Sequence, residues 1–250
     1  MEKQVVNYTY YLKDGKVLPE FLNVLFKYSV EVSKKNNFII NIHCNENFKK
    51  VCEEYEIVPD NFYELEEDLD IDGNIFWAYH KIKVYNKQPI GEWHLDTDAV
   101  FKKAPILDKN YDMQVAYLDI PFDELDELDF PEGYIIPEFY KKDLKGYNMS
   151  AICFHSQELK DLYCQNAFNF MKGNKVTHDK YNWYHMVFIE QASLKQICEY
   201  YNYSYKFLVE DLSNSPDYYH MASDKTRIVP SSQEIFVKEL KDELQKLQIN

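Results

Sequence analysis

The chain has 250 residues, of which 46% are apolar and 16% aromatic, and its formal net charge is −14 at pH 7. This apolar content excludes an intrinsically disordered protein, and only 6 Gly and 9 Pro leave no room for a low-complexity linker. The negative charge excludes a free-standing nucleic-acid-binding protein, because clustered Lys and Arg are needed to hold phosphate backbones. We therefore predict one compact domain over residues 1–250 and no nucleic-acid partner.

The cysteines and the hydropathy pattern predict the compartment. Five Cys residues are odd in number and scattered, with no C-x-x-C pair, so they predict neither a zinc ribbon nor a disulfide framework. The N-terminus carries no apolar block of a signal peptide, and no run approaches the ~20 apolar residues of a membrane-spanning helix. We predict a cytoplasmic protein without a transmembrane segment; attachment to the periphery of a membrane through a partner stays open.

Apolar periodicity predicts alternating strands and helices over the first part of the chain. The pattern alternates with period two in the predicted strands and recurs every three to four residues in the predicted helices. The expected elements are a strand at Val5 to Tyr11, a helix from Pro19 to Asn37, a strand at Phe38 to Ile42, a helix from Asn45 or Asn47 to about Tyr55, a short strand or its approach at Ile57-Val58, and a helix at Ile75 to Tyr85.

The triplet Asp96-Thr97-Asp98 follows a predicted strand at Gly91 to Leu95. Residues i and i+2 of extended backbone project to the same side, so the two carboxylates point together. Such oxygen ligands suit magnesium, manganese or calcium rather than zinc, and ligands of open α/β sheets bind outside the carboxyl ends of strands. The triplet predicts a divalent cation that bridges the protein to a nucleotide diphosphate. A chance acidic surface is the alternative, because the chain holds 42 Asp and Glu.

The second part of the chain continues the mixed α/β pattern, without internal repeats. The expected elements are strands at Met113 to Ile120, Met149 to Phe154 and Tyr205 to Val209, with helices at Gln157 to Met171, Tyr184 to Tyr201 and Ser232 to Leu247. The predicted fold class is therefore α/β, and the chain closes with a C-terminal helix within 231–250.

Several short motifs occur in a fixed order along the chain. They are Phe76-Trp77-Ala78 with Lys81, Asp96-Thr97-Asp98, Tyr147-Asn148-Met149-Ser150, Glu190-Gln191-Ala192-Ser193-Leu194, and His220 with Lys225. In this order they resemble GT-A glycosyltransferases, most closely the glycogenin and lipopolysaccharide galactosyltransferase type and related capsular sugar transferases. The resemblance spans roughly residues 5–228. It implies a single GT-A-like domain over 1–250, built as an α/β/α sandwich with a mixed central sheet.

The resemblance implies a metal centre. The family's Asp-x-Asp motif matches Asp96 and Asp98, which would hold Mn²⁺ or Mg²⁺, with Asp96 also facing the donor. His220 would be the third ligand, and an imidazole favours manganese somewhat over magnesium. A packed or surface histidine is the alternative reading of His220.

The resemblance also implies residues around the reacting sugar. Glu190 and Gln191 match an acidic family motif and would lie beside that sugar as catalytic residues together with Asp96. The third position of this motif is Ala192, which departs from the family's acidic residue. Asn148 would contact the donor or acceptor sugar, although Ser150 replaces the family's Gly. Glu190 and Gln191 could instead form the polar side of an amphipathic helix.

Three cationic residues would bind the donor. Lys225 matches the lysine of the family's His-x-x-Gly-x-x-Lys motif, shortened here by one residue, and would contact the diphosphate. Arg227 is the alternative for this charge role. Lys81 would contact a phosphate or a sugar, and a solvated charge on a helix is its alternative reading.

Together these assignments predict a metal-dependent glycosyltransferase of the hexosyltransferase type. By resemblance the donor is a UDP-sugar, and the acceptor is a glycan, a lipid-linked molecule or a protein. A haloacid-dehalogenase-type phosphatase is one alternative, because Asp96-Thr97-Asp98-Ala99-Val100 also satisfies Asp-x-Asp-x-(Thr/Val), in which Asp96 would be the nucleophile. A non-catalytic binding module on a degenerate transferase fold is the other.

Overall fold

The computed structural model describes residues 3–67, 70–73, 75–119, 130, 134–141, 145–172, 182–210, 215–221 and 230–249. The chain folds into two compact units, each assembled from separate stretches of sequence. Unit 1 comprises Met1–Glu66, Glu92–Ile106 and Asp211–Asn250, and unit 2 comprises Glu67–Gly91 and Leu107–Glu210. A single GT-A-like domain over 1–250 stays a prediction.

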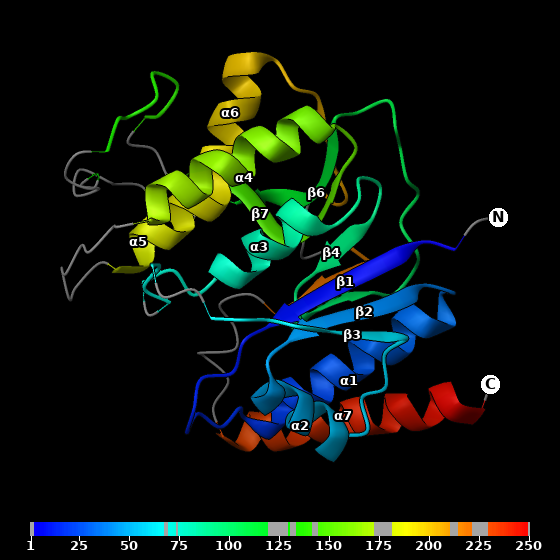
Figure 1. The fold of residues 1–250 in the computed structure, drawn as a ribbon. Helices are drawn as coiled ribbons and strands as arrows, with labels where there is room; N and C mark the ends of the chain where they lie inside the picture. Colours follow the sequence, from blue (N-terminus) through cyan, green and yellow to red (C-terminus); the bar gives the residue numbers. More distant parts are fainter. Residues whose placement is uncertain are drawn as a thin grey trace. The chain divides into compact units, whose positions relative to one another are not determined.

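Unit 1 contains a parallel sheet with helices on one face. Its strands lie in the order β3 (Asn61–Glu64), β2 (Ile39–Cys44), β1 (Val5–Tyr10) and β4 (Trp93–Leu95). Its helices are α1 (Glu20–Lys35), α2 (Glu46–Glu54) and α7 (Pro230–Ile249). Figure 1 shows these three helices on the same side of the sheet. The buried hydroxyl of Tyr8 lies 2.9 Å from the hydroxyl of Ser29 and 3.0 Å from that of Ser33, which ties β1 to α1.

A short antiparallel ladder in unit 1 was not predicted from the sequence. It pairs β5 (Ala99–Phe101) with β9 (Tyr218–His220). The register sets Ala99 opposite His220 and Phe101 opposite Tyr218. Each strand has only three residues, too few for a period-two pattern to stand out. The ladder joins two distant parts of the chain directly beside the Asp96-Thr97-Asp98 triplet.

Helix α7 completes the apolar core of unit 1. Its residues Val237, Leu240 and Leu244 recur at helical spacing and are all buried. They belong to one cluster with Phe21 and Leu25 of α1. Burial of each Leu or Val contributes about 1.5–3 kcal/mol, so this face holds the C-terminal helix on α1.

Unit 2 contains a mixed sheet and a run of helices. Its strands lie in the order β7 (Gly146–Phe154), β6 (Met113–Asp119) and β8 (Tyr205–Phe207). Strand β6 pairs antiparallel with β7 and parallel with β8. The helices are α3 (Tyr79–Lys87), α4 (Gln157–Met171), α5 (Asn182–Val187), the π-helical turn η1 (Phe188–Ala192) and α6 (Ser193–Tyr201). All nine residues of β7 are buried, so this strand belongs to the core of the unit.

The predicted α/β fold class is confirmed, and several element bounds are corrected. Helix α4 has the predicted bounds, because Ser156 caps it by accepting a hydrogen bond from the Leu159 amide at 3.2 Å. Helix α3 begins at Tyr79 rather than Ile75. The Ile57-Val58 segment is the approach to β3 rather than a strand. The helix predicted over Tyr184 to Tyr201 is interrupted by η1.

Two further predictions concern cysteine and membrane-spanning segments. All five cysteines are free and buried. Among the described residues, no helix has both the length and the apolar character needed to cross a bilayer.

Candidate metal centre and buried ion pair

The Asp96-Thr97-Asp98 triplet forms a tight turn at the carboxyl end of β4. The three residues of β4 are buried, so the strand fixes where the triplet begins. The Ala99 amide then donates a hydrogen bond to the Asp96 carbonyl at 3.0 Å and closes the turn. The side chain of Asp98 is only 7% exposed. A carboxylate this deeply buried requires a compensating charge or hydrogen bonds.

His220 reaches the triplet through the β5–β9 ladder. The Met221 amide donates a hydrogen bond to the Asp98 carbonyl at 3.0 Å, which continues the ladder beyond its last pair. The Nε2 atom of His220 lies 3.8 Å from the Oδ1 atom of Asp98, too far for a hydrogen bond. Asp96, Asp98 and His220 each offer a ligand atom, and these atoms lie within 4.8 Å of one another.

The three side chains fit a divalent cation. Ligand atoms on opposite sides of a magnesium or calcium ion are about 4–5 Å apart at the usual bond lengths, and the 4.8 Å spread of this group matches that range. Two carboxylates and one imidazole suit manganese or magnesium as ligands. This group could therefore bind a metal ion.

A buried ion pair connects two predicted site residues in unit 2. The Lys81 ammonium of α3 donates a hydrogen bond to the Oε1 atom of Glu190 in η1 at 2.7 Å. The two side chains are 11% and 9% exposed. The alternative reading of Lys81 as a solvated surface charge is therefore wrong, and so is that of Glu190 as the exposed side of an amphipathic helix.

The π-helical turn η1 sets the position of Glu190. π-helical turns occur mostly as single insertions within α-helices, frequently at functional sites. The Tyr163 hydroxyl of α4 donates a hydrogen bond to the Glu190 carbonyl at 2.9 Å. Burial, followed by the neighbouring Tyr85 and Glu190, raises the pKa of Tyr163 well above its usual value, so this hydroxyl stays a neutral donor. Sequence reasoning missed Tyr163, since nothing marks it among the chain's 22 tyrosines.

Gln191 lies next to Glu190 in the same turn. Its side-chain oxygen is buried and accepts no hydrogen bond within the described part of the chain. Orphaned polar atoms are rare in protein interiors and often mark a place where a water, an ion or a ligand binds.

Gly146 allows η1 to approach β7 closely. A Cβ atom at this position would lie 2.6 Å from the Gln191 carbonyl carbon and 2.7 Å from the Ala192 nitrogen. Because both are backbone atoms, they cannot rotate away. We expect Gly146→Ala to destabilise the protein by about 1–3 kcal/mol, as overpacking does. Urea unfolding measures this loss, and Gly73→Ala, whose added Cβ meets nothing within 4 Å, is the control. Equal stability of the two variants would contradict the close approach.

Asn148 is held within β7 and by its neighbour β6. Its side-chain amide donates a hydrogen bond to the Oδ2 atom of Asp119 at 3.0 Å. Its side-chain oxygen accepts hydrogen bonds from the Ser150 amide at 3.0 Å and from the Ser150 hydroxyl. Asn148 is therefore the third residue of a buried strand that begins at Gly146 rather than at Met149 as predicted, and its amide is fixed in orientation.

The predicted site residues divide between the two units. Asp96, Asp98 and His220 belong to unit 1, whereas Lys81, Asn148, Glu190 and Gln191 belong to unit 2. Lys225 and Arg227 lie outside the described residues.

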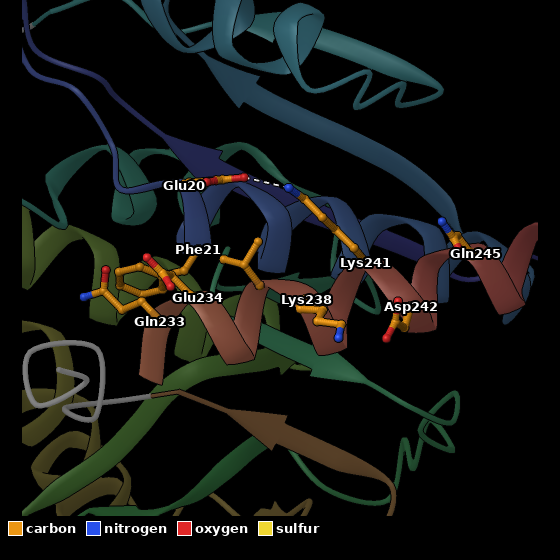
Figure 2. Close-up of a pocket in the computed structure, with 9 residues that line it drawn as sticks. Glu20, Phe21, Gln233, Glu234, Lys238, Lys241, Asp242 and Gln245 are labelled. Atoms are coloured by element: carbon orange, nitrogen blue, oxygen red, sulfur yellow. Dashed lines mark hydrogen bonds and ion pairs between the residues drawn. The ribbon is translucent and has the colours of Figure 1, made fainter. Parts of the chain in front are cut away.

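A hollow of about 610 Å³ lies between α1 and α7 in unit 1. Figure 2 shows Glu20 of α1 paired with Lys241 of α7 across it, and their charged atoms are 2.7 Å apart. Its lining also carries Glu234, Lys238 and Asp242. The three carboxylates of Glu20, Glu234 and Asp242 outnumber the two ammonium groups of Lys238 and Lys241, so the hollow offers no excess of positive charge to an anionic donor.

No protein-family model matches this sequence, and no curated protein does. Among solved structures, the glycosyltransferase GlyE of Streptococcus pneumoniae is similar over 99% of this chain and 64% of its own, with a TM-score of 0.49 and 9% identity. This chain therefore spans less than two thirds of GlyE.

Two further solved structures align with nearly the whole chain. The alignment with the 4-diphosphocytidyl-2C-methyl-D-erythritol synthase of Anaerococcus prevotii covers 96% of this chain and 99% of the synthase, with a TM-score of 0.43 and 9% identity. The alignment with HddC of Yersinia pseudotuberculosis covers 94% of this chain and 99% of HddC, with a TM-score of 0.43 and 10% identity.

Proposed function

We propose that this protein is a metal-dependent glycosyltransferase that moves a sugar from a nucleotide-sugar donor, a UDP-sugar, to a glycan, lipid-linked or protein acceptor. The observation that carries the proposal is the convergence of Asp96, Asp98 and His220 within 4.8 Å. These are the three residues that the resemblance assigns to the metal. His220 comes from a distant part of the chain, so its meeting with the two aspartates does not follow from their spacing in sequence.

The metal centre answers the main electrostatic demand of glycosyl transfer. Cleavage of the bond between the anomeric carbon and the diphosphate builds negative charge on the leaving oxygens. A divalent cation held by Asp96, Asp98 and His220 supplies Lewis-acid stabilisation of that charge. Lys225 and Arg227 add positive charge in this proposal. Manganese is the proposed ion because His220 is one of the ligands.

Glu190 and Gln191 act beside the reacting sugar in this proposal. Glu190 stabilises positive charge on the sugar ring or orients the acceptor hydroxyl. The 2.7 Å contact with Lys81 holds its carboxylate in one orientation. Lys81 thus acts on the reaction through Glu190 as a positioning residue, which refines the predicted direct contact with the donor.

A donor screen tests the proposal. The full chain is incubated with a panel of nucleotide sugars and Mn²⁺, and release of nucleoside diphosphate is measured. We expect slow hydrolysis of one donor, with complete loss on chelation by EDTA and recovery when Mn²⁺ is returned. Release of phosphate from p-nitrophenyl phosphate without donor hydrolysis would instead support the phosphatase. No turnover of either substrate, together with no calorimetric binding of UDP, would support the binding module.

A further inference from the structure

A hollow of about 300 Å³ in unit 1 is lined by residues of the β1–α1 loop, α1 and α2. None of the proposed metal ligands contributes to it. Its lining consists of Leu12, Lys13, Gly15, Lys16, Val17, Leu18, Asn23, Asn47, Lys50, Val51, Glu54 and Tyr55. This volume is at the lower end for ligand pockets, so it suits a small molecule.

The charge of this hollow is opposite to that of the chain. Asp and Glu outnumber Lys and Arg by 42 to 28 in the whole sequence. In the hollow, Lys13, Lys16 and Lys50 stand against the single carboxylate of Glu54. Within the described part of the chain, neither Lys16 nor Lys50 forms an ion pair or a side-chain hydrogen bond. Two ammonium groups are therefore available to an anion.

The loop that carries two of these lysines is held in place. Gly15 has a φ of +70°, which favours glycine, and the Lys16 amide donates a hydrogen bond to the Lys13 carbonyl at 3.1 Å across this turn. The Asn45 side chain accepts a hydrogen bond from the Leu12 amide at 3.0 Å and donates one to the Leu12 carbonyl at 2.8 Å. This loop is thus fixed before any ligand binds, which reduces the entropy lost on binding.

A buried amide faces this hollow without a partner. Asn23 lies in α1, is only 5% exposed and lines the hollow. Its side chain makes no hydrogen bond to any residue that the structure describes. Its amide is therefore available to hydrogen-bond a ligand in the hollow.

We infer that this hollow binds a small phosphorylated ligand. The lysines contact the phosphate group, and the Asn23 amide donates a hydrogen bond to one of its oxygens. Leu18, Val51 and Tyr55 form an apolar wall for an organic substituent. The inference does not rest on the proposed glycosyltransferase activity, because no metal ligand is involved.

Calorimetric titration in EDTA tests this site while the metal centre is empty. Inorganic phosphate and glucose 1-phosphate are the two probes, at constant ionic strength. We expect saturable millimolar binding of at least one probe, weakened at least about tenfold by the double variant Lys16→Gln/Lys50→Gln. The matched control is Lys35→Gln/Lys238→Gln, with the same charge change outside the hollow, for which we expect less than about a twofold change.

Asn23→Ala keeps the lysines and removes only the amide. We expect it to weaken binding of the tighter probe about tenfold, and thermal unfolding reports whether it folds. Tighter binding of glucose 1-phosphate than of phosphate would show that the apolar wall contacts the organic part of the ligand. Equal affinities would show that the site recognises the phosphate group alone. Absence of binding by both probes, or equal weakening in the control, would overturn the inference. The donor screen tests the metal centre and this titration tests the hollow. A negative result in one experiment therefore leaves the other proposal standing.

Discussion

Asp98→Asn is expected to abolish manganese-dependent binding of UDP. The side chain of Asp98 is 7% exposed, and its Oδ1 atom lies 3.8 Å from His220. The substitution keeps the shape of the residue but replaces an anionic ligand by a neutral amide oxygen. Loss of residues that merely orient metal ligands reduces metal affinity about 10–100-fold, so we expect loss of a direct ligand to exceed about 100-fold.

Calorimetric titration of UDP with Mn²⁺, and again with EDTA, measures this effect. The matched control is Asp217→Asn, which makes the same charge change in unit 1 at a side chain that is 59% exposed. We expect that variant to bind like the parent. Unchanged affinity in Asp98→Asn would show that the ligand assignment is wrong, whatever the donor screen reports.

The second large effect is expected from breaking the Lys81–Glu190 pair. Lys81→Met leaves the Glu190 carboxylate buried without its cation, and removal of one partner from a buried ion pair destabilises proteins by about 3–5 kcal/mol. Urea unfolding of the parent and the variant measures the change in the free energy of unfolding. The double variant Lys81→Met/Glu190→Gln should recover most of this loss, because no uncompensated charge then remains buried.

The exposed Lys241–Glu20 pair provides the control for Lys81→Met. Its charged atoms also lie 2.7 Å apart, but its side chains are 54% and 56% exposed. We expect Lys241→Met to change stability by less than about 1 kcal/mol, as exposed ion pairs do. If Lys81→Met had an equally small effect, Lys81 would be solvated, and its positioning role toward Glu190 would fall with it.

The sequence alone determined the local features of this protein. Helix α4 could be predicted to its last residue, because apolar spacing and the Ser156 cap are both encoded within sixteen consecutive residues. Asp96 and Asp98 could be paired as ligands from sequence because they are only two residues apart, although the triplet forms a turn rather than the predicted extended backbone. Their place after β4 also follows from a short apolar run.

The tertiary structure decided which distant residues meet. The β5–β9 ladder brings His220 to Asp98, and its three-residue strands carry too little pattern to be predicted. Lys81 and Glu190 are 109 residues apart, and their burial follows from how α3 and η1 pack in the core of unit 2. Backbone pairing between distant strands and desolvation of a charge depend on the whole fold, whereas periodicity and capping depend only on neighbours along the chain.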